Sequence, residues 1–515
     1  MASPLFYCPL FALAIAVLWR KGRVWSGPPT LIAAELAVPL LLGLLAYAYG
    51  QTLLLNVRWG WSAERLAPTL GLFHGYPLYS PRDRGPINGW IHGPIAPLLW
   101  IPAALADSPL PALSIAAAIN LLILLLPLLL ASLRPAGGAG PGRLLGFAFS
   151  GAALLQVYPT WYMASVLCTD AVAVGLGLGS CLVLLARPSL GTRPLLLAAV
   201  LAVLATWTKQ IEAPLVFAQL GWVWIVAGRR AALRYAGIYA AVAAGVSAAL
   251  LLGFNARNLI LNMWTIPSAQ KLVGSWGGAA LEVQQFLVYS LVFSVPVVIA
   301  LACYGKAPAA PPKGASLRSA LGLLLAAAAV LLPLGAMASI KIGGDRNSIH
   351  SVYYLAAAAA VAFGAAWGSP ARWAWLGRTA ALLAAGATGI LAARQVHGYP
   401  AMSMLPPRCL SQEAWTYARQ HPFETYFPQD PLATLMAEGK MYHFDYAVLD
   451  RKFGGVVTTP EHIRADLPAK LDAVVYPQAD GPKEVLTDYL PDYAFTRATG
   501  TWLIYRPKAA PAPKP

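Results

Sequence analysis

The chain of 515 residues carries little charge, because Asp, Glu, Lys and Arg make up 11% of it and hydrophobic residues make up 58%. Ordinary soluble domains carry roughly 25% charged residues. Apolar runs, many of them close to the roughly 20 residues that cross a bilayer, extend from the start of the chain to about residue 395. This composition excludes a set of separate soluble domains and predicts that much of the surface faces lipid.

Cysteine is also scarce. The five cysteines include no Cys-x-x-Cys pair, and only Cys409 lies in the polar C-terminal segment. Neither a disulfide within that segment nor a zinc site built from cysteine alone can form there. The glycine-rich stretch at 175–179 follows no strand, so it predicts helix packing and not a dinucleotide site.

The chain carries a clear excess of positive charge. A formal net charge of +16 would suggest nucleic acid in a soluble protein. Here much of the Lys and Arg falls in every second connection between apolar runs, and the positive-inside rule places those connections in the cytoplasm. We therefore expect no nucleic-acid partner. The other connections, including 56–110 and the tail from 396, are then extracytoplasmic.

The apolar windows predict a polytopic α-helical membrane protein with about twelve transmembrane helices. We expect a transmembrane domain at 1–395 that includes the extracytoplasmic loop 56–110, a small α/β domain at 396–507 and a disordered end at 508–515. The predicted spans lie near 4–19, 31–55, 111–133, 144–162, 165–186, 195–212, 213–227, 235–254, 285–304, 319–340, 351–367 and 379–395.

Each of the two long extracytoplasmic segments has a residue pattern that predicts its secondary structure. The loop is rich in Trp, Tyr, Pro and Gly, which predicts short helices lying on the membrane surface. In the tail, the hydrophobic patterns predict a helix at 411–422, a strand at 471–477, a helix at 482–490 and a strand hairpin at 493–507. That alternation is typical of a small α/β unit.

Ionisable residues in so apolar a chain are candidates for function. Glu64 lies near the start of the loop, Asp83 is flanked by Arg82 and Arg84, and Arg58 precedes them. A carboxylate with arginines nearby suits a transferase that deprotonates a hydroxyl beside an anionic phosphate donor. The alternative is that these residues are solvated charges at the membrane surface.

A second candidate is the pair Lys209 and Gln210, at the end of the apolar run 195–208. A charge at that depth is unfavourable unless it faces a cavity or a partner, and a phosphate is a suitable partner for Lys. The alternative is a Lys that extends to the membrane surface or pairs with Glu212.

A third candidate is the loop at 343–354, which gathers Arg346, Asn347 and His350 after two glycines. Backbone N–H groups and the Arg fork can hold a phosphate or pyrophosphate head group. A plain polar turn is the alternative. Asp170 opens a span as a second carboxylate, or serves only as a helix N-cap.

Three short patterns together resemble the integral-membrane glycosyltransferases of the GT-C superfamily, in a bacterial branch like families 39 and 87. They are the acidic residue followed by Gly-x-Pro-Leu-Tyr at 75–79, the Thr-Lys-Gln of 208–210, and the Gly-Gly-x-x-Asn of 343–347. The α/β tail is also similar to that group.

The resemblance implies transfer of a sugar from a polyprenyl-phosphate donor, on the extracytoplasmic face of the inner membrane, to a lipid, glycan or protein. It implies Glu64 as the general base of a single inverting displacement, with Asp170 as a possible helper. Lys209 and the 343–354 loop would hold the lipid phosphate. Relatives often carry an Asp where this chain has 59–63, which leaves Asp83 as an alternative base or the chain without activity.

Two classes of protein other than a glycosyltransferase also fit the sequence. About twelve spans with broken helices also describe a secondary transporter or a lipid flippase. A non-catalytic scaffold that presents the tail is the third reading. No cofactor is indicated with certainty, although a divalent metal is possible if Glu64, Asp83 and Asp170 converge.

Overall fold

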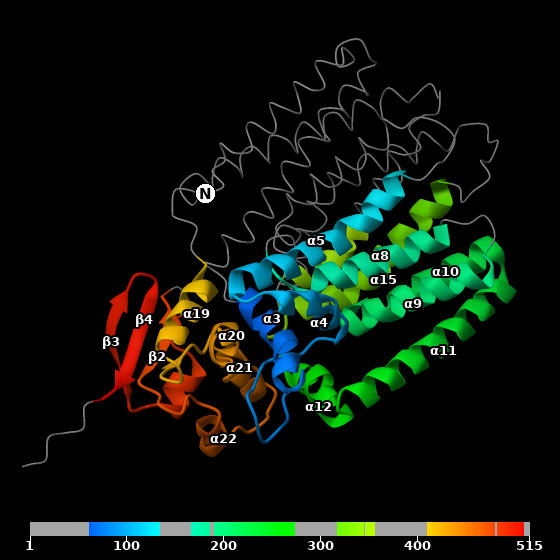
Figure 1. Ribbon diagram of the computed structural model, residues 1–515. Coiled ribbons are helices and arrows are strands. Elements are labelled where there is room, and N and C mark those ends of the chain that lie inside the picture. The colour runs from blue at the N-terminus through cyan, green and yellow to red at the C-terminus, as the bar shows by residue number, and fades with distance from the viewer. Residues whose placement is uncertain are drawn as a thin grey trace, which may run out of the picture.

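The computed structural model describes residues 61–133, 166–185, 190–272, 317–344, 346–355, 409–478 and 481–508. The described part of the chain is mostly helical, with a bundle of long helices at one end and a small sheet with its own helices at the other (Figure 1). The predicted spans at 4–19, 31–55, 144–162, 285–304 and 379–395, and the disordered end, lie outside these residues or nearly so.

Among the described residues, six long helices form the bundle, and each falls on a predicted apolar run. Helix α8 packs against α5 and α9, α11 packs against α9 and α10, and α10 packs against α15. Their bounds are α5 Pro109–Leu133, α8 Thr169–Leu185, α9 Thr192–Thr208, α10 Leu215–Ala227, α11 Arg229–Gly253 and α15 Leu317–Ser339.

Three segments of the described chain are long and apolar enough to cross a membrane, namely Gln210–Ala227, Arg229–Gly253 and Gly322–Ser339. Large apolar side chains on α10 and α11 stay exposed, among them Ile225 at 86% and Leu252 at 87%. Such exposure is unfavourable in water and is expected where a helix faces lipid.

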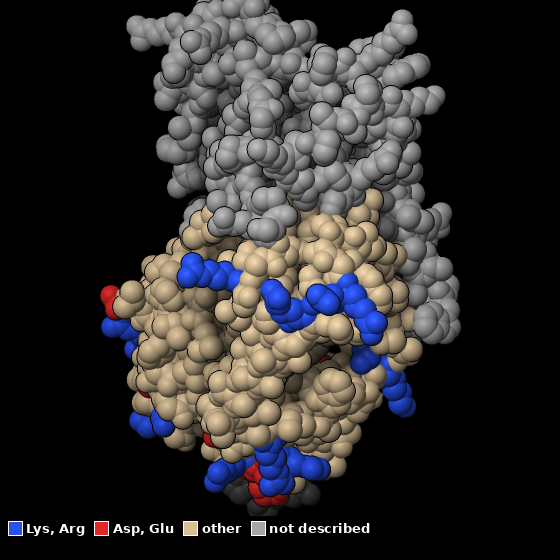
Figure 2. All heavy atoms as spheres, turned by 90° about the vertical axis from the view of Figure 1, so that its right-hand side faces the viewer, with Lys and Arg blue, Asp and Glu red and all other residues tan. Residues whose placement is uncertain are grey.

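The basic residues gather at one end of the bundle. Arg229, Arg230 and Arg234 lie in the first turns of α11, where α10 gives way to it. Figure 2, which faces this end, shows a row of Lys and Arg across the surface. The positive-inside rule predicts that this end lies in the cytoplasm.

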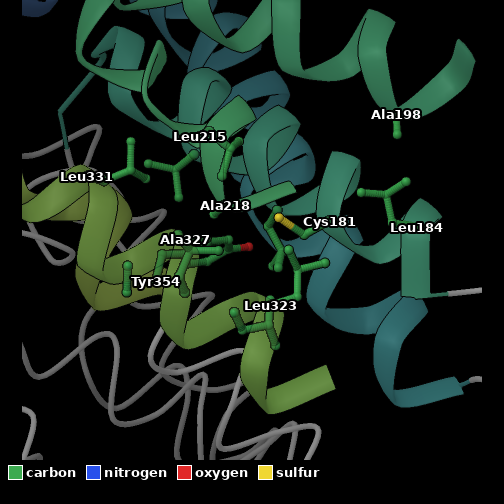
Figure 3. Close-up of a cluster of buried hydrophobic side chains, with 14 of the residues drawn as sticks. Cys181, Leu184, Ala198, Leu215, Ala218, Leu323, Ala327, Leu331 and Tyr354 are labelled. Carbon is green, nitrogen blue, oxygen red and sulfur yellow. The ribbon is translucent and has the colours of Figure 1, made fainter. Parts of the chain in front are cut away.

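The inside of the bundle is apolar. Figure 3 shows side chains of α8, α10 and α15 meeting around Tyr354, with Cys181, Leu215 and Leu323 among them. Because small residues such as Ala218 and Ala327 lie between the larger ones, the helices pack closely.

The described part of the loop predicted at 56–110 forms short helices, as the sequence predicts. They are α3 Trp61–Gly71, η1 Leu72–His74, α4 Ile95–Trp100 and η2 Ile101–Leu105. Further short helical segments follow α11, namely α12 Ala256–Ile260, η4 Leu261–Thr265 and α13 Ile266–Ala269.

The tail contains a four-stranded sheet in the order β1-β2-β4-β3, in which β1 is parallel to β2 and the other pairs are antiparallel. The predicted helix at 411–422, the strand at 471–477 and the hairpin at 493–507 are confirmed. The described elements are α19 Leu410–Gln420, β1 Thr425–Tyr426, α20 Pro431–Glu438, α21 Asp445–Phe453, α22 Pro460–Ala465, β2 Ala473–Pro477, η6 Val485–Tyr489, β3 Tyr493–Thr499 and β4 Trp502–Pro507.

The helix predicted at 482–490 is shorter than the pattern suggests. It is a single wide turn, η6, that ends just before Pro491. The N–H of Val485 donates to the buried carboxylate of Asp445 at 2.7 Å, so a group outside the helix satisfies this first N–H. Pro491 has no N–H with which to continue one.

The tail holds segment 80–82 of the loop through a buried cation. Arg451 on α21 is 1% exposed and donates to three consecutive backbone carbonyls, those of Ser80 at 3.3 Å, Pro81 at 2.6 Å and Arg82 at 2.9 Å. Burial lowers the pKa of Arg451 to about 10, so it stays charged at neutral pH. The loop carbonyls thus replace the water that this guanidinium loses.

Two histidines of the tail bind the same loop. The N–H of Ile87 donates to Nδ1 of His443 at 3.1 Å, and the N–H of Phe444 donates to the carbonyl of Ile87 at 2.8 Å. The ring of His462 lies 2.8 Å from the carbonyl of Gly85. Segment 80–88 is therefore held by the tail along its length.

We expect Arg451→Met to lower the free energy of unfolding by about 2–4 kcal/mol, because three carbonyls lose a charged donor. The amide of Ile87 should also exchange hydrogen faster, since the loop is released. Denaturation in detergent and hydrogen exchange measure the two effects. Arg506→Met is the matched control, because Arg506 pairs with Asp472 at the surface and should change stability by less than about 1 kcal/mol. An unchanged exchange rate at Ile87 would contradict this account of the loop.

Candidate functional site

Three ionisable side chains meet inside the described part of the bundle. The Nζ of Lys209 lies 2.5 Å from Oδ1 of Asp170, and Nδ1 of His350 lies 3.4 Å from the same oxygen. Their exposed fractions are 7%, 3% and 1% respectively. The sequence singled out all three, and the structure brings them together from segments that are far apart in the chain.

The end of α9 explains why Lys209 points into the bundle. Helix α9 stops at Thr208, and Lys209 has an extended backbone with φ −145° and ψ 123° before the short turn η3, Gln210–Glu212. Pro214 then precedes α10. The break between α9 and α10 turns the Lys209 side chain toward the start of α8, where Asp170 lies in the first turn.

Glu212 occupies the neighbouring position. It is 2% exposed, and its Oε1 accepts a hydrogen bond from the hydroxyl of Ser351. A Cβ on Gly177 would lie 3.3 Å from its Oε2, so α8 approaches it closely. The sequence allowed Glu212 as the partner of Lys209, whereas the short ion pair of Lys209 is with Asp170.

The loop that contains Ile91 and Gly93 reaches the same place. Gln210 donates from Nε2 to the carbonyls of Ile91 at 3.3 Å and Met263 at 3.1 Å, so it holds two loops together. The N–H of Gly93 donates to the carbonyl of Thr208 at 3.2 Å. A Cβ on Gly93 would lie 1.4 Å from the carbonyl oxygen of Trp207, so only glycine permits this approach.

His92 lies between the loop and the buried ion pair. Burial, together with the charges of Lys209 and Arg65, lowers its pKa to about 3. The ring is therefore neutral at physiological pH, and its edge meets the ring of Trp90 at 5.8 Å between centroids.

Glu64 lies on α3, next to the segment that leads into α8. It is 7% exposed, its Oε2 is buried and has no hydrogen-bond partner among the described residues, and burial raises its pKa to about 8. Its neighbour Arg65 donates to the carbonyl of Leu167 at 3.0 Å, and the hydroxyl of Ser62 accepts from the N–H of Leu167 at 3.0 Å. A buried carboxyl with a raised pKa is a candidate proton acceptor.

The other predicted site residues lie elsewhere. The side chains of Arg82 and Asp83 are 54% and 80% exposed and lie 3.9 Å apart, and Arg84 is exposed beside them. Asn347 is partly buried in the short helix η5, Arg346–Ile349. Arg58 and the side chain of Arg346 lie outside the described part of the structure.

A metal site formed jointly by Glu64, Asp83 and Asp170 does not occur. Within the described ranges, no group of three or more His, Cys, Asp or Glu side chains could hold a metal ion. Asp83 is at the surface, whereas Glu64 and Asp170 are buried. The possibility that the sequence left open, a metal held by these three carboxylates together, is therefore not supported.

Sequence reasoning gave no role to two charged groups near the site. Arg65 was given no function, although its position directly after the candidate base Glu64 was a sequence signal that could have identified it. Glu212 was considered only as a salt-bridge partner. Its burial depends on Ser351, 139 residues away, which no local pattern reveals.

The comparisons with known proteins give a fold. No family model and no curated protein sequence matches the chain. Among solved structures, it is similar to the crystal structure of ArnT from Cupriavidus metallidurans bound to undecaprenyl phosphate. The TM-score is 0.55 and the identity is 11%, over 92% of this chain and 98% of that chain.

The chain shares the overall fold of that structure. At 11% identity the similarity concerns the fold alone, and it supports the polytopic helical membrane architecture that the sequence predicts. The buried ion pair of Lys209 and Asp170 therefore lies within a helical bundle of that fold.

We expect Gly93→Ala to lower the free energy of unfolding by about 1–3 kcal/mol, because the new methyl group cannot fit against the Trp207 carbonyl. Gly179→Ala in α8 is the matched control. A Cβ there meets only Leu201 at 3.7 Å, so this variant should be neutral or slightly more stable. Thermal unfolding in the same detergent compares them, and equal stabilities for the two variants would contradict the close approach of the loop to α9.

Proposed function

We propose that the protein is a membrane glycosyltransferase that moves a sugar from a polyprenyl-phosphate donor to an acceptor hydroxyl on the extracytoplasmic side. The observation that carries the proposal is the buried cation Lys209 at a helix break, in a fold similar to that of a protein crystallised with undecaprenyl phosphate. A buried Lys is expected to face an anion, and a phosphate is a suitable second one.

Lys209 can bind a phosphate in addition to Asp170. Its ammonium group has three N–H donors, and the contact with Asp170 uses one of them. His350, on the other side of Asp170, adds a group that can carry a proton close to the phosphate. Gln210 keeps the extracytoplasmic loop against this site through the carbonyls of Ile91 and Met263.

Glu64 is proposed as the general base. It takes the proton of the acceptor hydroxyl, the acceptor oxygen forms a bond to the anomeric carbon, and the bond from that carbon to the phosphate oxygen breaks. The polyprenyl phosphate leaves with the electron pair of that bond, and Lys209 stabilises its charge. The single displacement inverts the anomeric carbon.

Several observations support this division of roles. Glu64 and Lys209 belong to different segments, yet the charges of Arg65 and Lys209 both lower the pKa of His92. Groups next to the proposed base and at the proposed phosphate site therefore both act electrostatically on the same loop residue, which supports one shared site. The transporter or flippase gains no support from the fold similarity. A position near families 39 and 87 remains part of the proposal, as do the inner membrane and the extracytoplasmic direction of the site.

We expect Lys209→Met to weaken binding of polyprenyl phosphate by about ten- to a hundredfold, the loss of one charge-assisted hydrogen bond. Equilibrium binding of a labelled polyprenyl phosphate to the purified protein in nanodiscs measures this. Lys452→Met is the control, because Lys452 pairs with Glu484 and Asp488 at the surface of the tail. Equal affinities for wild type and Lys209→Met would remove Lys209 from the donor site.

We expect Glu64→Gln to bind polyprenyl phosphate normally and to lose transfer by about a hundredfold or more, because the base is gone and the shape is kept. The assay uses a panel of radiolabelled polyprenyl-phosphate sugars with wild type and variant side by side. If Asp83→Asn abolishes transfer and Glu64→Gln does not, Asp83 is the base. If wild type transfers no sugar from the panel, the transferase proposal fails.

A further inference from the structure

A short helical segment directly follows α11. Helix α11 is long and apolar enough to cross a membrane, and Leu252 near its end is 87% exposed. Its 25 residues extend roughly 37 Å, which exceeds the roughly 30 Å of a hydrocarbon core. Helix α12 begins at Ala256, and the chain from Gly253 to that residue reaches at most about 10 Å. Helix α12 therefore starts in or beside the head-group layer of the bilayer.

The chain changes direction between the two helices. Phe254 has an extended backbone, with φ −117° and ψ 111°. The side-chain oxygen of Asn255 accepts a hydrogen bond from the N–H of Asn258 at 3.2 Å, so Asn255 caps α12 as a new helix. Figure 1 shows α12 turning away from the line of α11. A helix that turns just beyond the end of a span is placed to lie along the membrane surface.

One face of this segment is exposed and has the composition of an interfacial helix. Ile260 is 50% exposed and Trp264 is 69% exposed. Arg257 is exposed as well, and it forms no ion pair with an acidic side chain of the described residues. Residues three and four apart share one face of a helix, so these three side chains lie together. Trp favours the depth of the head groups, and the Arg guanidinium forms paired hydrogen bonds with phosphate.

The opposite face is buried and bonded to the loop predicted at 56–110. Nδ2 of Asn262 donates to the carbonyl of Ser80 at 2.9 Å, and the hydroxyl of Tyr79 donates to Sδ of Met263 at 3.3 Å. Asn262 and Met263 are 2% and 8% exposed. The carbonyl of Met263 also accepts the hydrogen bond from Gln210. The turn η4 thus contacts both the loop and the break between α9 and α10.

The end of the segment is fixed to two further parts of the protein. Nζ of Lys341, which follows α15, donates to the carbonyl of Pro267 at 2.8 Å. Nε2 of Gln270 donates to Oδ1 of Asp450 on α21 at 3.0 Å. The segment 256–270 therefore connects the loop, the break after α9, the chain after α15 and the tail.

We propose that α12, η4 and α13 form a membrane-surface clamp. Its exposed face binds the phospholipid head groups, with Trp264 at their depth and Arg257 on a lipid phosphate. Its buried face holds the loop against the break after α9. The partner is a lipid surface, because the segment starts within reach of the head groups and because its exposed face combines apolar side chains with a cation. The inference does not depend on a transferase activity, since it concerns how the protein lies in the membrane.

Fluorine NMR of the full-length protein in nanodiscs tests the contact with lipid. The protein carries 5-fluorotryptophan, and the signal of Trp264 is identified by its loss in Trp264→Phe. Phospholipid with a nitroxide on its head group should broaden this signal strongly. The signal of Trp502, on β4 of the tail, is assigned in the same way and should broaden much less.

Two other outcomes of this experiment would overturn the inference. If a water-soluble gadolinium chelate broadens the Trp264 signal and the labelled lipid does not, the exposed face lies in water. If neither agent broadens it, protein covers the face.

The contact of Arg257 with phosphate is tested by thermal unfolding in nanodiscs of phosphatidylglycerol and of phosphatidylcholine. Anionic lipid attracts each cation at the membrane surface, so Arg257→Gln should reduce the extra stability in phosphatidylglycerol by about 1–3 °C. Arg497→Gln is the matched control, because Arg497 is an exposed cation on β3 of the tail. Equal changes for the two variants would overturn the assignment of Arg257 to lipid phosphate.

Hydrogen exchange in nanodiscs tests whether the clamp holds the loop. The N–H of Gly93 donates to the carbonyl of Thr208. In Trp264→Gln, which loses the preference for the head-group layer, this amide should exchange about threefold faster or more. The amide of Ile87 should keep its rate, because His443 of the tail holds it.

Trp264→Tyr is the control for this measurement, because Tyr also favours the head-group layer. It should exchange at Gly93 as the wild type does. If Trp264→Gln leaves the exchange of Gly93 unchanged, or accelerates Ile87 as much as Gly93, the segment does not clamp the loop and the inference is overturned.

Discussion

The ion pair of Lys209 and Asp170 is the interaction on which the arrangement of the helical bundle depends. Each of the two ions loses several kcal/mol of hydration when it is buried, so neither is stable there without the other. Helix α9 must end and α8 must begin at the same depth for the two side chains to meet. Nδ1 of His350 lies 3.4 Å from the same oxygen of Asp170, and this contact positions the segment 346–355.

The position of the loop follows from the same requirement. The loop can cover the ion pair only if it comes close to the end of α9, and Gly93 makes that approach possible. The segment before Gly93 is held at 80–88 by Arg451, His443 and His462 of the tail. Tail, loop and helix end thus form one continuous series of contacts.

Sequence reasoning succeeded where a single local property decides the outcome. The apolar runs predicted the described long helices, and the charge at the end of one run singled out Lys209. The partner of Lys209 was beyond local reach, because Asp170 lies 39 residues earlier, while Glu212 is close in sequence and looked equally suitable. Long-range packing, and not composition, chose between them.

Burial is the second property that the sequence did not reveal. Glu64 and Asp83 are both loop carboxylates with arginines nearby, yet the first is 7% exposed and the side chain of the second is 80% exposed. The difference arises because Leu167 and the tail cover α3, while Asp83 lies on the outer turn of the loop. Asp450 shows the converse, since a carboxylate on a polar helix became partly buried only when α13 packed against α21.

The pairing of Lys209 with Asp170 also bears on how a polyprenyl phosphate would be held. A phosphate that approaches Lys209 meets a cation whose charge is already compensated in part by Asp170, and the same carboxylate repels it. The net attraction at the head group is therefore smaller than an unpaired lysine would give. Such a site orients the phosphate but does not bind it tightly. That balance suits a transferase, because the phosphate that remains after transfer carries more negative charge than the donor and must still leave.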